Sequence, residues 1–177
     1  MKRDAVAVFG SSQAPPSSGT YRTARELGLE LARLGAEIRC GGYSGVMEAV
    51  AAGGKEGGAR VIGCTIGWFA DTRTPCAGLS EIQDSRDLHE RVQCLLRGAR
   101  SAIALPGGIG TFNELFWVWT LLLHGRQDAP ARLVLLDGPW DELLDFLGRR
   151  FEFGEAARNL VRVASTPQVA AELAWTI

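Results

Sequence analysis

Short apolar runs alternate with longer segments of helical period along the chain, and this alternation constrains the fold more than any other feature. Strands that are apolar on both faces are typical of a parallel sheet covered by helices on each side. We therefore expect an α/β fold with a mainly parallel sheet. The expected strands span Ala5–Phe9, Glu37–Cys40, Arg60–Thr65, Ser101–Leu105, Arg132–Leu136 and Leu160–Ala164, and the expected helices span Gly19–Leu34, Gly45–Gly54, Arg86–Arg97, Phe112–Leu123, Pro139–Arg150 and Pro167–Trp175.

The length of 177 residues and the 46% apolar content suit one domain, which we expect to span residues 1–177. A formal net charge of −1 disfavours a general nucleic-acid or anionic-membrane surface, so a small-molecule ligand is the expected partner. The chain opens on Met1-Lys2-Arg3-Asp4 without an apolar leader, and no apolar run is long enough to cross a membrane. We expect a soluble, cytoplasmic protein.

The positions of the cysteines and lysines in the sequence disfavour a metal site and a pyridoxal phosphate site. Cys40, Cys64, Cys76 and Cys94 lie far apart without a CxxC pair, so we expect all four to be reduced and structural, with no metal site. Pyridoxal phosphate needs a Schiff-base lysine, and the two lysines occur near the N-terminus and in a glycine-rich helix end. We expect no cofactor.

The segment Leu105–Glu114 combines a strand end, a glycine-rich turn and a helix start. Gly107, Gly108 and Gly110 let backbone N–H groups approach a ligand closely, and the helix start adds unpaired N–H donors and a positive dipole end. This pattern predicts a phosphate cradle with the Glu114 carboxylate beside it. Thr111 and Glu114 also match a capping box, so the residues alone leave a capping role and a catalytic role for Glu114 equally open.

Two further glycine-bearing turns follow strands, namely Gly10-Ser11-Ser12 and Gly41-Gly42-Tyr43-Ser44-Gly45-Val46-Met47. Ligands of open α/β sheets bind beyond the carboxyl ends of the strands, so we expect all three turns at one edge. None of the turns has the GxGxxG or GxxxxGK[ST] spacing, which favours a ligand of mononucleotide size.

Three other features carry open alternatives. Arg91 lies at the edge of an apolar helix stripe, where a surface arginine is the simpler interpretation, and His89 is favoured as solvent-facing or structural. The helix Phe112–Leu123 is apolar almost all round, which predicts either a homodimer through this helix or its burial under the C-terminal segment. The irregular stretch Ile66–Gln83 is a predicted lid, with an irregular extended piece near Leu79–Gln83.

Four segments together resemble the LOG family of cytokinin riboside 5′-monophosphate phosphoribohydrolases, which are often mislabelled lysine decarboxylases. The segments are Val8–Ser12, Gly41–Met47, Leu88-His89-Glu90-Arg91 and the PGGxGTxxE signature Pro106–Glu114. The resemblance implies a Rossmann-like homodimer that hydrolyses the N-glycosidic bond of a nucleoside 5′-monophosphate to free base and ribose 5-phosphate. It implies catalytic roles for Arg91 and Glu114, and ligand binding by Gly107, Gly108, Gly110, Thr111, Gly41, Gly42, Gly45 and Met47, with Gly10, Ser11 and Ser12 in the neighbouring turn.

The chain departs from the family pattern at two positions. Val92 stands where a lysine is usual, and Asn113 stands where a second acidic residue is usual. Related proteins of this fold resemble molybdenum cofactor carriers, which bind a phosphorylated pterin without hydrolysis. A non-catalytic carrier of a phosphorylated cofactor is therefore the alternative function.

Overall fold

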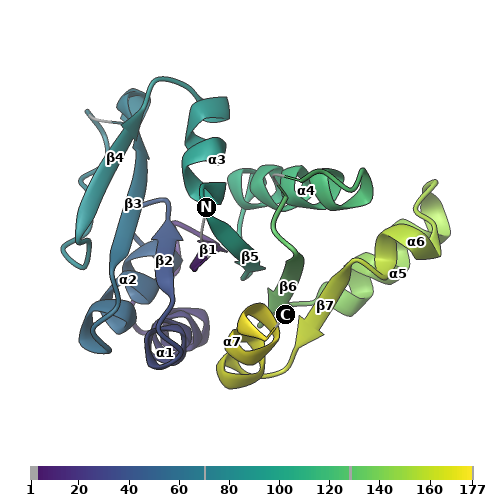
Figure 1. The fold of residues 1–177 in the computed structure, drawn as a ribbon, viewed down its shortest axis with the longest axis horizontal. Coiled ribbons are helices and arrows are strands. Elements are labelled where there is room, and N and C mark those ends of the chain that lie inside the picture. The colour runs from purple at the N-terminus through teal and green to yellow at the C-terminus, as the bar shows by residue number, and fades with distance from the viewer. Residues whose placement is uncertain (1–3, 70, 128, 177) are drawn as a thin grey trace.

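The computed structural model describes residues 4–69, 71–127 and 129–176, and its core is a parallel seven-stranded sheet (Figure 1). The strand order is β4-β3-β2-β1-β5-β6-β7, and every neighbouring pair is parallel. The expected α/β class is confirmed. Residues 1–3 and 177 of the expected single domain lie outside the described residues. The strands are β1 (Ala5–Phe9), β2 (Glu37–Cys40), β3 (Val61–Ile66), β4 (Glu81–Ser85), β5 (Ala99–Ala104), β6 (Arg132–Leu136) and β7 (Val161–Ala164).

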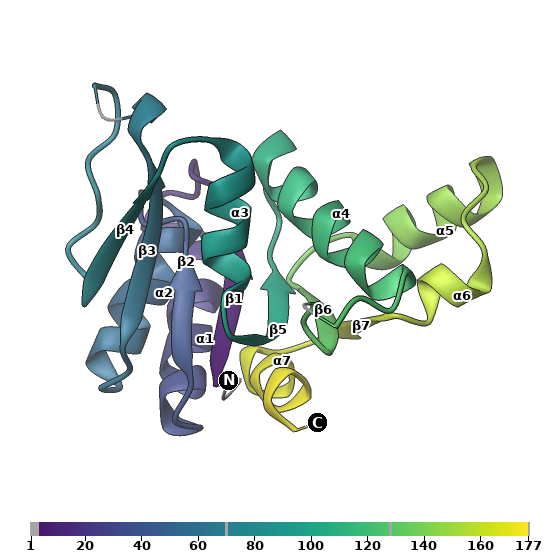
Figure 2. The same cartoon turned by 45° about the horizontal axis from the view of Figure 1, so that its top comes forward.

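Helices cover both faces of the sheet and complete three layers (Figure 2). The apolar sides of α1, α2 and α7 pack in the core on one face, and those of α3, α4 and α5 pack in the core on the other. The helices are α1 (Gly19–Arg33), α2 (Val46–Glu56), α3 (Leu88–Leu96), α4 (Ile109–Leu123), α5 (Trp140–Arg150), α6 (Glu155–Arg158) and α7 (Pro167–Trp175), with a 3₁₀ turn η1 (Gly67–Phe69).

The predicted elements are present with boundary shifts of a few residues, and two features differ from expectation. The piece expected to be irregular near Leu79–Gln83 forms the regular edge strand β4, because its backbone pairs with β3 from Glu81 to Ser85. The short helix α6 was not expected, since four residues are too few to show a helical period.

The strand order places the ends of β2, β1 and β5 side by side at the middle of the sheet. The chain runs outward from β1 through β2 and β3 to β4 and then returns to β5 on the other side of β1. This change of direction is the topological switch point at which open α/β sheets bind ligands. The three glycine turns leave from these three central strands.

Cys64 of β3 and Cys94 of α3 form a disulfide, with 6.0 Å between their Cα atoms. The expectation that all four cysteines are reduced is therefore wrong for this pair, while Cys40 and Cys76 are free. A sequence separation of 30 gives no hint of the pairing, because only the packing of α3 on β3 brings the two side chains together.

Within the described part of the chain, no helix has both the length and the apolar content that a membrane span needs.

Candidate functional site

The three glycine turns meet at the carboxyl edge of the sheet, with Ser11 between the other two. The Ser11 N–H donates to the Pro106 carbonyl at 3.0 Å, and the Ser11 carbonyl accepts from the Val46 N–H at 2.9 Å. A Cβ at Gly10 would overlap the Val46 side chain, and a Cβ at Gly45, whose φ is 72°, would overlap the Ser11 carbonyl oxygen. The close packing of the first two turns thus explains both glycines. The expectation that the turns converge is confirmed.

The helix α4 begins without a capping side chain, which corrects the capping-box interpretation. Gly108 is the N-cap with extended backbone, so Thr111 lies at the third helical position and Glu114 lies beyond the first turn. Glu114 therefore does not reach back to the helix start. Because the first N–H groups of a helix have no intrahelical partner, those of Ile109, Gly110 and Thr111 are available to an anion.

The glycines of this turn divide into two kinds. A Cβ at Gly107 would overlap Thr111 Oγ1 and lie 2.9 Å from the Ser11 nitrogen, so Gly107 is required by packing. A Cβ at Gly108 or at Gly110 would meet nothing within 4 Å, and both residues are exposed. These two glycines form the open surface of the predicted phosphate cradle. Beside it lies a cavity of about 350 Å³, lined by Ser11, Gln13, Ala14, Ser18, Thr20, Pro106 and Gly107.

Arg91 and Glu114 form an ion pair beneath the turns. Arg91 Nη1 lies 3.0 Å from Glu114 Oε1, and each side chain is only 11% exposed. The Arg91 Nε–H donates to the Cys64 carbonyl at 2.8 Å, and Nη2 donates to the Gly41 carbonyl at 3.4 Å. The interpretation of Arg91 as a surface arginine is therefore wrong, because its guanidinium is turned inward onto β2, β3 and α4.

Burial raises the pKa of Glu114 to about 7, and the positive charge and hydrogen bond of Arg91 act in the opposite direction. Burial disfavours the ionised carboxylate, whereas the guanidinium favours it. A carboxyl group that titrates near neutrality, beside an arginine and next to the predicted phosphate cradle, is a candidate for general acid or base chemistry or for stabilising a cation.

The second glycine turn, Gly41–Met47, packs against the Arg91–Glu114 pair. A Cβ at Gly41 would overlap Arg91 Nη2, so only glycine lets the guanidinium reach the strand end. Met47 is buried, and its sulfur lies against Gly41. The positive φ of Gly42, 78°, turns the chain toward Tyr43, and the Gly42 carbonyl accepts from the Cys76 N–H at 2.9 Å. This bond joins the predicted lid to the turn; Ala70 of that lid lies outside the described residues.

Ser11 and Ser12 differ in how the fold uses them. Ser11 lines the cavity, and its Oγ accepts from the Gln13 N–H at 3.0 Å. The Ser12 carbonyl accepts from the Ser44 hydroxyl at 2.9 Å, which links the first and second turns.

His89 is exposed. Its Nε2 lies 2.9 Å from the Gln93 side-chain nitrogen, and its ring packs edge-on against Trp117 with ring centroids 5.3 Å apart. The structural interpretation of His89 fits these contacts.

Two parts of the site, a backbone carbonyl of β3 and the segment between β1 and α1, were not predicted from the sequence. The Cys64 carbonyl holds Arg91, and no side-chain pattern reveals a backbone acceptor. Gln13 and Ser18 of the β1–α1 segment and Thr20 of α1 also line the cavity. Of the two departures from the family pattern, Val92 is on the buried side of α3, and Asn113 lies on the exposed side of α4.

Comparison with known proteins shows the family to which the chain belongs. The model of a family described as "Possible lysine decarboxylase" matches residues 47–174. The cytokinin riboside 5′-monophosphate phosphoribohydrolase LOG4 of Arabidopsis thaliana is 33% identical over 171 residues, which cover 95% of this chain and 79% of the relative. The chain belongs to the LOG family. A probable rice enzyme of this name, LOGL6, is also 33% identical, over 92% of this chain and 67% of its own.

Solved structures share the fold of this LOG-family protein. The X-ray structure of TM1055 has a TM-score of 0.74 and 26% identity, and the match covers 100% of both chains. The molybdenum cofactor binding protein of Rippkaea orientalis has a TM-score of 0.73 and 24% identity over 98% of this chain and 96% of its own. At that identity the second likeness shows the fold alone.

Proposed function

We propose that this LOG-family protein hydrolyses the N-glycosidic bond of a nucleoside 5′-monophosphate, of the AMP or cytokinin riboside monophosphate type, to free base and ribose 5-phosphate. The observation that carries the proposal is the buried Arg91–Glu114 pair next to an uncapped, glycine-bearing helix start. The relatives named phosphoribohydrolases support the reaction class.

The phosphate binds at the start of α4 in this proposal. The N–H groups of Ile109, Gly110 and Thr111 and the positive end of the helix dipole neutralise its charge. Gly108 and Gly110 leave the cradle open, and Ser11 borders the cavity beside it. Glu114 follows Gly110 by four residues, or about 6 Å along the helix axis, so a sugar attached to the phosphate extends toward its carboxylate.

The chemistry follows that of glycoside hydrolysis. As the bond between the ribose anomeric carbon and the base nitrogen breaks, the sugar gains oxocarbenium character. Ionised Glu114 stabilises this cation or orients the attacking water, whose oxygen bonds to the anomeric carbon while a proton passes to the departing base. Arg91 stabilises the ionised form of Glu114 and presents its guanidinium to the phosphate or the base. Binding of the remote phosphate fixes the reacting bond near these groups.

Base release from a panel of nucleoside 5′-monophosphates tests the proposal. The panel contains AMP, N6-isopentenyl-AMP, GMP and CMP, with adenosine as the unphosphorylated control, and products are separated by chromatography. We expect at least one monophosphate to release its base and adenosine to be a far poorer substrate. Glu114→Gln should lower kcat by about 100-fold or more while circular dichroism shows a native fold.

Two results would contradict this function. If Glu114→Gln is as active as the wild type, the carboxylate takes no part in catalysis. If no monophosphate is cleaved and the purified protein retains a phosphorylated cofactor instead, the protein is a carrier of the kind named as the alternative.

A further inference from the structure

The main chain and the side chain of Cys64 both act on Arg91. The Cys64 carbonyl accepts from the Arg91 Nε–H at 2.8 Å, and the Cys64 sulfur is bonded to Cys94 on the same helix as Arg91. Arg91 and Cys94 are three residues apart in α3, so their side chains project from one face of the helix toward β3. The disulfide thus joins the helix that carries Arg91 to the strand that holds its guanidinium.

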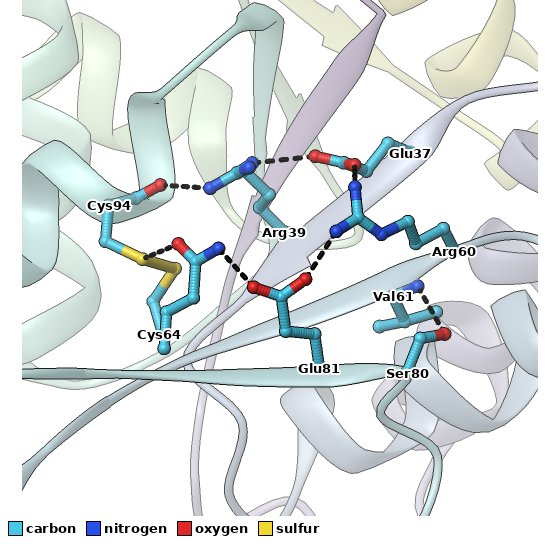
Figure 3. Close-up of polar contacts among 9 residues, drawn as sticks. Glu37, Arg39, Arg60, Val61, Cys64, Ser80, Glu81 and Cys94 are labelled. Atoms are coloured by element: carbon cyan, nitrogen blue, oxygen red, sulfur yellow. Dashed lines mark hydrogen bonds and ion pairs between the residues drawn. A yellow bond between two sulfur atoms is a disulfide. The ribbon is translucent and has the colours of Figure 1, made fainter.

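A buried polar network fixes the end of the same helix. The Cys94 carbonyl, in the last turn of α3, accepts from Arg39 Nη1 at 2.8 Å (Figure 3). Arg39 is 6% exposed and pairs through Nε with Glu37 at 2.9 Å, and Arg60 links Glu37 to Glu81 across β2, β3 and β4. This network holds the main chain at the end of α3, and the disulfide holds the side chain three residues beyond Arg91.

α3 needs such fixing because it is short. It has nine residues, and isolated helices of this length are marginal, so its position depends on tertiary contacts. The guanidinium of Arg91 must meet the Cys64 carbonyl, the Gly41 carbonyl and the Glu114 carboxylate at once. A displacement of α3 by about 1 Å is enough to break such a set of contacts and to cost a large factor in rate.

We propose that the Cys64–Cys94 disulfide is a positioning element for Arg91, and that the thiol–disulfide state of this pair sets the activity of the Arg91–Glu114 site. The proposal rests on the function proposed above. A dithiol reductant breaks the S–S bond, one hydrogen is added to each protein sulfur, and the dithiol is oxidised to its cyclic disulfide. Reduced α3 keeps its fold and its network with Arg39, but it no longer holds Arg91 in register with Glu114.

The pH profile separates positioning from general stability. Among the described residues, Arg91 of α3 is the charged group that lowers the pKa of Glu114. The Cys40 thiol of β2 is neutral, because burial raises its pKa to about 12. When Arg91 withdraws, the buried carboxylate loses the charge that lowers its pKa. The acidic limb of the activity profile then moves to higher pH, which loss of stability alone does not produce.

The test compares Cys64→Ser and Cys94→Ser with Cys40→Ser. Cys40 is also fully buried but is free, so it is the matched control for placing a hydroxyl in the core. We expect both disulfide variants to lose kcat by about 10- to 100-fold, with a small change in KM and an acidic limb shifted to higher pH. Cys40→Ser should keep the wild-type pH profile. Dithiothreitol should reproduce the loss in the wild type and leave Cys94→Ser unchanged, which keeps the test valid if a serine variant fails to fold.

Readouts other than turnover distinguish failure of this proposal from failure of the proposed function. Alkylation of the unfolded, unreduced protein followed by mass spectrometry should label Cys40 and Cys76 only; labelling of all four cysteines overturns the proposal. An NMR titration of the Glu114 carboxyl should give a higher pKa in Cys94→Ser than in the wild type, whether or not a nucleotide is cleaved. Equal pKa values, or wild-type kcat and pH profile in both disulfide variants, also overturn it.

Discussion

Glu114 owes its chemistry to its surroundings rather than to its position in a motif. The motif placed it in a capping box, but the helix starts earlier, at Ile109, and the carboxylate turns to Arg91 instead. Burial raises the pKa of Glu114, and Arg91 offsets part of that increase. The carboxyl group therefore titrates close to neutral pH. Arg91 in turn is held by two backbone carbonyls, an arrangement that leaves no trace in side-chain spacing.

This environment predicts the pH dependence of catalysis. Because the pKa of Glu114 is raised to about 7 and the proposed reaction uses the ionised form, kcat/KM should fall about tenfold for each pH unit below that value and level off above it. The measurement is base release from the best monophosphate between pH 5 and pH 9, with circular dichroism at each pH as the control for folding. A flat profile down to pH 5 would show that Glu114 is not the titrating group.

The start of α4 lacks the side-chain cap that its sequence predicts. A helix with a good side-chain cap is more stable, yet here the N-cap is a glycine and no side chain satisfies the first N–H groups. Capping rules therefore mislocate the helix start at Thr111. The open glycines beside a tightly packed one are what an anion cradle requires.

Two matched substitutions separate packing from ligand binding in this element. Gly110→Ala should raise the melting temperature, because alanine is favoured over glycine in a helix by up to about 1 kcal/mol and nothing lies within 4 Å of the new methyl group. It should also raise KM for the monophosphate, since the methyl group covers the cradle. Gly107→Ala should destabilise the protein by about 1–3 kcal/mol, because its methyl group overlaps Thr111.

Thermal unfolding and substrate kinetics on the same two proteins check this pair. An unchanged KM in Gly110→Ala would mean that the phosphate does not contact this turn.

The molecule exposes an apolar face along α4 that the described part of the chain leaves uncovered. Ile109 is 89% exposed and Trp117 is 37% exposed, and a groove of about 580 Å³ is lined by Ile109, Phe112, Asn113, Phe116, Trp117, Thr120 and Leu121. The C-terminal segment covers only the opposite side: the Trp119 indole donates to the Ala157 carbonyl at 2.8 Å, and α7 packs on the other face of the sheet. Burial under that segment, the alternative to a dimer, therefore holds for Trp119 but not for Trp117.

We propose that a second copy of the chain covers this face in a homodimer through α4. Trp117→Arg should then shift the mass measured by light scattering from about twice 19.0 kDa to one chain. Trp68→Arg is the control, because Trp68 is 62% exposed and lies in η1, away from α4. A wild-type protein that is monomeric at working concentration would remove the proposal.

The fold class, the order of the elements and the convergence of the three glycine turns were predictable from the sequence. They follow from local hydrophobic period and from the rule that parallel strands end at one edge. The family resemblance also named Arg91 and Glu114, but the contacts between distant residues in the site could not be predicted from the sequence. Arg91 and Glu114 are 23 positions apart, and Cys64 and Cys94 are separated by 30.

Only the tertiary structure decided that Arg91 points inward, that a disulfide ties its helix to β3, and that the α4 cap is empty. The physical reason is that periodicity reports which face of an element is buried, while backbone carbonyls, helix starts and side-chain partners are fixed by how the elements pack.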